Sequence, residues 1–211
     1  MTTLRQPFRL GLYTLGDAIL VVGLGLLGGI VNVTISSIPH PHFMLWGARV
    51  PYGSFFVLAP VIAMLLVRKP GVAFVTALVY GLVQAIARAN WNSLSFGFME
   101  GLGAEIVFAL FRYQRFDALS AFLAGGIGAR TPDNLWSLVN ASASPSGHVM
   151  PGMSAEQFAP WQTFVGGEIL GLLVLGVLSG LVGWALAKLI ERTPLMAWLN
   201  ARWGHASSPA H

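Results

Sequence analysis

Four acidic residues lie in or beside long apolar stretches of the sequence: Asp17, Glu100, Glu105 and Glu168. An ionised carboxylate at the middle of a bilayer costs roughly 2.5–3.5 kcal/mol, so such residues usually face the protein interior and carry function. Glu100 and Glu105 are five positions apart, about 140° around a helix, and so cannot both face one narrow site. Glu105 lies deeper in its apolar stretch, one turn after Gly101. We therefore expect Glu105 to be the buried acid of the two.

Glu105 and Glu168 are the two acids that we predict to bind a ligand, because no lysine or arginine lies close to either in the sequence. The alternative is that one of them is protonated, or pairs with Arg88 or Arg130 across helices. Asp17, near the start of the first apolar stretch, could reach the membrane interface or pair with an arginine there.

Tryptophan and amide side chains collect on one side of the membrane in the topology derived below: Trp46, Gln84, Asn90, Trp91, Asn92, Trp136, Asn140 and Trp161. A carboxylate with tryptophan rings suits a flat ligand that is cationic or heteroaromatic. Any single tryptophan could instead be an interface anchor. From this set we select Gln84, Trp91, Asn92, Trp136 and Trp161 as candidate substrate-binding residues.

Catalytic and metal chemistry find little support in the sequence. His40 and His42 form a loop pair with no third ligand beside them, and the chain has no cysteine. Phosphate-binding, dinucleotide-binding, serine-triad and zinc-protease motifs are absent. We therefore expect no catalytic residues, no metal and no bound cofactor. An intramembrane enzyme would need an activated nucleophile, and a purely structural subunit would not need several buried acids.

Composition places the chain among membrane proteins. Of its 211 residues 55% are hydrophobic and only 9% are charged, whereas about 25% are charged in a soluble domain. Stretches long enough to cross a bilayer predict an all-α membrane protein with six transmembrane helices. The expected spans are residues 10–38, 52–67, 71–89, 94–111, 118–139 and 161–190. They form one domain, 1–192, followed by a tail at 193–211, and the loop at 140–160 is a candidate lid.

The positions of the basic residues orient these six spans. Nine of the twelve fall on one side: Arg5, Arg9, Arg68, Lys69, Arg112, Arg115, Lys188, Arg192 and Arg202. Arg49, Arg88 and Arg130 fall on the other. The positive-inside rule then places both termini in the cytoplasm. We expect a multi-pass protein of the bacterial cytoplasmic membrane and attribute its basic charge to this topology rather than to nucleic-acid binding.

Small residues recur at four-residue spacing in the first span, as Thr14 with Ala18 and Gly25 with Gly29. Such spacing allows two helices to approach closely. The partner helix could belong to this chain or to another subunit, and we take these four residues as candidates for docking a partner.

Two segments carry a resemblance to a known family. GFMEGLGAEIVFALFRYQRFDALSAFLAGG resembles the core motif of the YkoE family, in which a Gly-x-Gly-Ala-Glu helix leads to an aromatic-Arg-Tyr turn. YGSFFVLAPVIAMLLVRKPGVAF resembles the second and third helices of that family. The similarity extends from about Gly28 to Ala129. The glutamate and the two glycines of the family motif match Glu105, Gly101 and Gly103 of this sequence. The turn at Trp91-Asn92 departs from the Trp-Gly expected there.

Members of that family are substrate-binding (S) components of energy-coupling factor (ECF) transporters. The resemblance implies a vitamin substrate, thiamine or its hydroxymethylpyrimidine precursor. It also implies a transmembrane coupling (T) subunit and cytoplasmic ATPase subunits that use ATP. Glu105 and Glu168 would then bind from the membrane interior, and Trp91, Trp136 and Trp161 would close from outside. The alternatives are a different vitamin or a cation-coupled carrier of a small molecule.

Overall fold

The computed structural model describes residues 13–37, 44–45, 48–49, 57–128 and 177–203. The helices are α1 (Leu15–Ser37), α2 (Leu58–Val67), α3 (Val72–Arg88), α4 (Asn92–Leu110), α5 (Ala118–Leu123), the π-helix η2 (Ala124–Gly128), α8 (Val177–Glu191) and α9 (Pro194–Trp203). Two short strands, β1 (Met44–Leu45) and β2 (Ala48–Arg49), form an antiparallel pair. Apart from this pair, the regular structure in these ranges is helical, as the sequence predicts.

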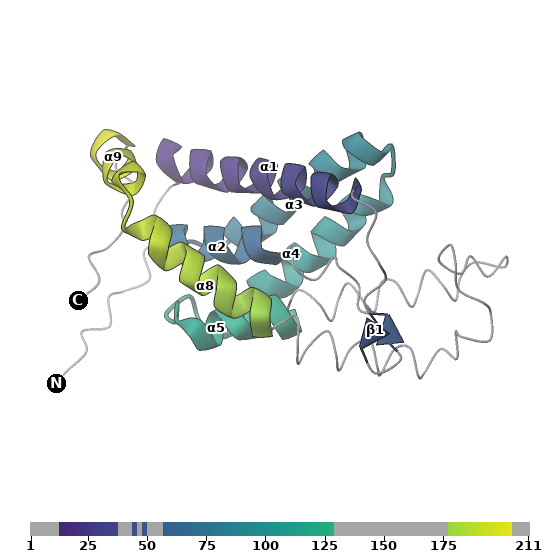
Figure 1. Cartoon of the computed structure of the whole chain (residues 1–211). Coiled ribbons are helices and arrows are strands. Elements are labelled where there is room, and N and C mark those ends of the chain that lie inside the picture. The colour runs from purple at the N-terminus through teal and green to yellow at the C-terminus, as the bar shows by residue number, and fades with distance from the viewer. Residues whose placement is uncertain (1–12, 38–43, 46–47, 50–56, 129–176, 204–211) are drawn as a thin grey trace, which may run out of the picture.

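Helix α2 occupies the centre of the bundle. It packs against α1, α3 and α8, and Figure 1 shows it between α1 on one side and α8 on the other. Every residue from Ala59 to Val67 is buried. A helix enclosed on all sides needs no polar face, which explains why this segment is a continuous run of apolar residues.

The predicted spans and the observed helices start and end at different residues. Helix α1 begins at Leu15 rather than at 10, and α2 begins at Leu58 rather than at 52. Helices α3 and α4 lie within three residues of the predicted bounds. The end of the fifth predicted span, the first half of the sixth and the candidate lid lie outside the described residues.

Capping groups fix several helix ends. Asp117 and Ser120 form a reciprocal capping box at the start of α5, with 2.9 Å from the Ser120 nitrogen to Asp117 Oδ1. The Ser120 N–H, with help from Arg115, lowers the pKa of the Asp117 carboxyl. Thr14 and Asp17 make a similar pair of bonds at the start of α1. Because a carboxylate is favoured near a helix N-terminus, both acids have a structural role.

Glycines bring the helices into close contact. A Cβ on Gly97 of α4 would lie 2.6 Å from the Ala77 carbonyl oxygen and 3.0 Å from Gly81 Cα, both on α3. On α1, a Cβ on Gly25 or Gly29 would collide with α3, at 2.8 Å and 2.6 Å from the Cβ atoms of Val79 and Val83. Gly25 and Gly29 therefore pack inside this chain, which is one of the two alternatives that the sequence left open, and their role in docking a partner subunit stays a prediction.

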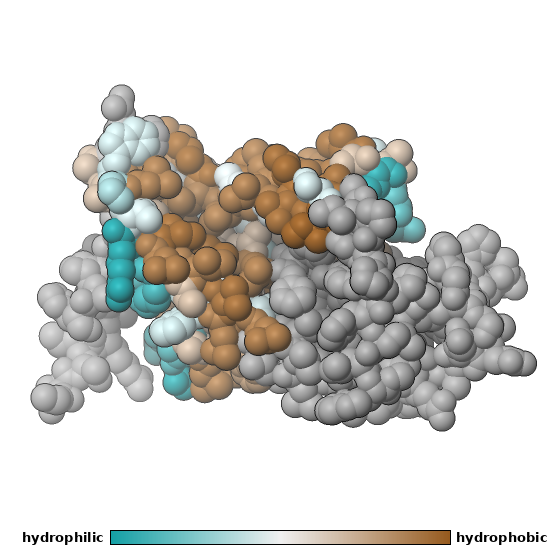
Figure 2. Space-filling view, in the orientation of Figure 1, coloured by the Kyte–Doolittle hydropathy of each residue, from teal (hydrophilic) through white to brown (hydrophobic). Residues whose placement is uncertain are grey.

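The middle of the bundle carries an apolar surface. Figure 2 shows hydrophobic residues over the central part of this face and hydrophilic ones gathered toward its two ends. Helix α1 alone exposes Leu15, Ile19, Val22, Leu26, Leu27, Ile30, Val31 and Ile35. In water so large an apolar surface would drive aggregation, whereas in a bilayer it faces lipid. Among the described residues two helical stretches, Leu15–Ile35 and Asn92–Leu110, are long and apolar enough to cross a membrane.

The contact between α3 and α4 predicts a position-dependent effect of the same substitution. Gly97→Ala places a methyl group against the α3 backbone and should destabilise the bundle by about 1–3 kcal/mol through overpacking. Gly23→Ala is the matched control, since nothing lies within 4 Å of a Cβ built there. Thermal unfolding in detergent should show a lower transition for the first variant and an unchanged or higher one for the second. Equal transitions would mean that α3 and α4 are not packed this closely.

Candidate functional site

A set of polar side chains is buried along α3, at its contacts with α1 and α4. We call Asn32, Tyr80, Gln84, Arg88 and Glu100 the polar cluster. Four of its members, all but Arg88, are between 3% and 6% exposed. The Asn32 amide donates to the Tyr80 hydroxyl, and Arg88 Nη2 donates to Asn32 Oδ1 at 3.1 Å. Asn32 therefore joins Tyr80 and Arg88 across the contact between α1 and α3.

Helix periodicity explains how the cluster assembles. Tyr80, Gln84 and Arg88 follow one another at four-residue spacing, so they share one face of α3. Asn32 comes three residues after Gly29, whose missing side chain lets α1 approach α3. Glu100 lies between Gly97 and Gly101, where α4 packs directly on α3. The same small residues that close the helix contacts therefore bury the polar groups.

The chemistry of the cluster suits a polar ligand. Glu100 on α4 and Arg88 on α3 bring a carboxylate and a guanidinium to two helices that pack closely together. The cluster offers a negative acceptor, two amides and a hydroxyl, all inside an apolar bundle. Buried ionisable groups in membrane-spanning helices usually line a substrate or ion site. It is the strongest candidate for a binding site in the described part of the chain.

Glu105, the acid predicted to be buried and to bind the ligand, has a different position. It is only partly buried, whereas Glu100 is 5% exposed, so the expected order of burial is wrong. Its carboxylate accepts the first backbone N–H groups of α3, with 2.6 Å from Gly71 N to Oε1 and 3.1 Å from Ala73 N to Oε2. Phe74 N is 3.4 Å from Oε2. Glu105 therefore caps α3 from a neighbouring helix.

Tyr113 completes the surroundings of Glu105. Its hydroxyl donates to Glu105 Oε1 at 2.8 Å. Burial, together with this bond and the negative charge beside it, raises the pKa of Tyr113, so the hydroxyl remains a donor at neutral pH. With three backbone donors and one phenol on two oxygens, Glu105 has little capacity left for a ligand.

Ion pairs gather at the same end of the bundle, which we call the basic end. Lys69 Nζ lies 2.5 Å from Oδ2 of Asp17, whose side chain is 1% exposed. Arg68 Nη2 lies 2.8 Å from Glu191 Oε1, and Lys188 also reaches Glu191. Asp17 thus pairs with a cation, as in one of the two alternatives that the sequence left open, but the partner is Lys69 rather than an arginine. These pairs join the start of α1, the α2–α3 turn and the end of α8.

The other predicted site residues are dispersed. Trp91 is 67% exposed in the turn between α3 and α4, and Asn92 begins α4 beside it, with its N–H bonded to Asn90 Oδ1 at 3.0 Å. Gly101 packs against Ala77 and Phe74 of α3, which is a helix contact. Glu168, Trp136 and Trp161 lie outside the described residues. Of the predicted residues that the structure describes, only Gln84 joins the polar cluster.

Sequence reasoning overlooked four members of the cluster, Asn32, Tyr80, Arg88 and Glu100, as ligand-binding candidates. The sequence held a signal for three of them, and Arg88 follows Gln84 by four residues. Tyr80 precedes Gln84 by four residues, and Glu100 is flanked at close spacing by Gly97 and Gly101. Asn32 could not be assigned in this way, because its neighbour Tyr80 is 48 residues away in the sequence.

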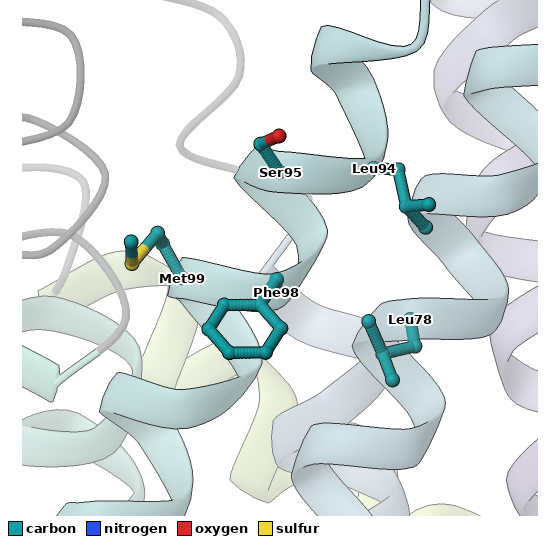
Figure 3. A pocket seen from close by; sticks show the side chains of 5 residues that line it. All are labelled: Leu78, Leu94, Ser95, Phe98 and Met99. Atoms are coloured by element: carbon teal, nitrogen blue, oxygen red, sulfur yellow. The ribbon is translucent and has the colours of Figure 1, made fainter.

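A shallow hollow of about 380 Å³ lies beside α4 and is lined by Leu78, Leu94, Ser95, Phe98 and Met99. Figure 3 shows that four of these side chains come from α4 while Leu78 comes from the neighbouring helix. Its lining is apolar except for Ser95, so it offers no partner for a charged ligand. Within the described ranges, no group of three or more metal-ligating side chains is present.

Comparison with known proteins places this arrangement in a family. Residues 16–131, more than half of the chain, match the family described as "ABC-type cobalt transport system, permease component". The chain belongs to this family. As a permease-family protein with apolar helices facing outward, it is a membrane protein.

Two relatives of this permease-family chain are informative. It is 30% identical over 89 residues to YkoE of Bacillus subtilis (strain 168), which is named as a candidate HMP/thiamine permease; the match spans 41% of this chain and 44% of the relative. A solved structure, described as the crystal structure of an S-component of an ECF transporter, matches over 90% of both chains with a TM-score of 0.66 and 21% identity. The chain thus has the S-component fold, and the resemblance seen in the sequence is confirmed.

The capping role of Glu105 predicts a loss of stability on truncation. Glu105→Ala leaves three backbone N–H groups of α3 without their acceptor and should lower the unfolding free energy by about 1–3 kcal/mol. Glu105→Gln keeps one acceptor oxygen and should lose less. Gln114→Ala, at an exposed turn position, is the control. Thermal unfolding in detergent measures all three, and an unchanged transition in Glu105→Ala would contradict the cap.

Proposed function

We propose that this protein is the S component of an ECF-type importer for thiamine or its hydroxymethylpyrimidine precursor. The observation that carries the proposal is the similarity to YkoE, together with an S-component fold matched over 90% of the chain. In this proposal the chain binds the vitamin and catalyses no reaction. It holds no cofactor, and partner ATPase subunits hydrolyse the ATP.

The polar cluster is the proposed core of the substrate site, with Glu100 taking the role that the sequence predicted for Glu105. A carboxylate accepts hydrogen bonds from an aminopyrimidine or balances the cationic thiazolium of thiamine. Tyr80, Gln84 and Asn32 supply neutral donors and acceptors beside it. Trp91 and Asn92 lie at the nearest helix turn, and Glu168, Trp136 and Trp161 remain proposed contributors, with the two tryptophans stacking on the ligand rings.

The basic end is proposed to face the cytoplasm, in a six-span topology with both termini inside the bacterial cytoplasmic membrane. Four basic residues that the sequence assigns to the inside, Arg68, Lys69, Arg112 and Lys188, lie in or beside the ends joined there. The T subunit is proposed to dock on the outer face of α1. Ala18 lies on that exposed face, whereas Thr14 is engaged with Asp17.

A titration tests the substrate and separates the two acids. Thiamine and hydroxymethylpyrimidine should each quench the tryptophan fluorescence of the purified protein saturably at sub-micromolar concentration. Glu100→Gln should weaken binding at least about tenfold, or 1.4 kcal/mol. Glu105→Gln should bind normally despite its lower thermal stability. A greater loss for thiamine than for the neutral pyrimidine in Glu100→Gln would place the carboxylate against the thiazolium.

The opposite pattern, with Glu105→Gln losing the ligand and Glu100→Gln binding normally, would move the site to the end of α4. If neither compound binds a folded protein, the fold assignment remains and the thiamine assignment fails. The choice would then return to another vitamin or to a cation-coupled carrier.

Cysteine labelling tests the orientation, because the natural chain contains no cysteine. Trp91→Cys and Arg115→Cys introduce single thiols at opposite ends of α4, at positions 67% and 52% exposed. In intact cells a membrane-impermeant maleimide should label position 91 and leave position 115 unlabelled until the membrane is opened. Labelling of position 115 in intact cells would reverse the proposed topology.

A further inference from the structure

Helix α9 has a different orientation from the rest of the bundle. In Figure 1, α1, α2 and α8 run across the picture, whereas α9 is seen nearly along its axis. The chain turns between Glu191 and Pro194, where Thr193 Oγ1 donates to the Ile190 carbonyl oxygen at 2.7 Å. Proline is favoured at the first position of a helix, because the N–H that it lacks would have no partner within the helix there. Helix α9 therefore lies across the end of the bundle.

One face of α9 is fixed to the protein. Met196 and Leu199 are each 2% exposed and belong to the apolar core, and α9 contacts both α1 and α8. The ion pair between Arg68 and Glu191 holds the last residue of α8, shortly before α9, to the α2–α3 turn. The position of α9 at the basic end is thus set by packing and by charge.

The neighbouring face of α9 is apolar and exposed. Leu195 and Trp198, three residues apart, are 56% and 47% exposed. Leu15, at the adjoining start of α1, is 61% exposed. Helices α1 and α9, which contact each other, thus both expose apolar side chains. Figure 2 shows pale and brown residues mixed at the place of α9, at the left of the view, next to the brown surface of the bundle.

A positive charge beside this face matches an anionic membrane surface. Arg192 lies two residues before α9 and is exposed. Tryptophan and leucine on one side of a helix that lies in the membrane plane, with arginine nearby, is the pattern of an interfacial helix. Tryptophan is also enriched at the level of the headgroups.

We propose that α9 is an interfacial helix that inserts Leu195 and Trp198 into the lipid leaflet at the basic end, with the adjacent Arg192 on anionic headgroups. The partner of this surface is lipid, not a protein subunit. The inference depends on the membrane location of the bundle and not on the identity of the substrate.

Spin labelling in nanodiscs of phosphatidylcholine and phosphatidylglycerol tests the proposal on the full chain without other subunits. Single cysteines replace Leu195, or Trp198 as a second position in case the first variant does not fold. The depth of the label is then measured from how strongly oxygen, which concentrates in lipid, and a water-soluble nickel complex each relax it. The label at position 195 should lie about 5–10 Å below the headgroup boundary.

Two control positions give the label depths expected in the lipid interior and in water. Leu27→Cys, at the middle of α1 and 58% exposed, should report a deeper label. Arg115→Cys, in the turn after α4, should report a label in water. If positions 195 and 198 behave like position 115 in folded protein, α9 faces water and the proposal is overturned. Failure of the vitamin titration would leave this measurement unaffected.

Discussion

The carboxylate of Glu105, placed against the start of α3, is the contact on which much of this structure depends. The first N–H groups of a helix have no partner within the helix, and in a membrane protein an unpaired backbone group costs several kcal/mol. Neither Gly71 nor Trp91, the residues before α3 and α4, caps its helix with a side chain. Glu105 supplies the missing acceptors for α3 from α4. The bond therefore stabilises a helix end and fixes how α4 lies against α3.

The arrangement of α4 then decides which acid faces the interior. With Glu105 at the N-terminus of α3, the face of α4 that carries Gly97 and Gly101 packs on α3, and Glu100 enters the bundle near Tyr80. The two acids thus have separate roles at two depths. One holds the helices together, and the other belongs to a polar cluster that suits a ligand.

The two ends of the bundle differ in the same way. At the basic end, ion pairs such as Lys69 with Asp17 connect segments that are about 50 residues or more apart in the sequence. At the opposite end of α3, Arg88 and Asn32 extend the polar cluster toward the surface. One end of the bundle is therefore held together by ion pairs, and the other end carries the buried polar groups that are proposed to bind the ligand. Helix α9 adds a second kind of anchor at the basic end.

The sequence alone determined the class of protein, the helical character of the described segments and the family resemblance. These properties follow from local composition, from the lengths of apolar runs and from a motif contained within one helix and its turn. It also indicated that acids in α4 matter. Only the tertiary structure decided that Glu100 is buried and Glu105 is a cap, and that Gly25 and Gly29 pack inside the chain. The physical reason is that each of these roles depends on a neighbouring helix, and the rotation of one helix against another is set by contacts between residues far apart in the sequence.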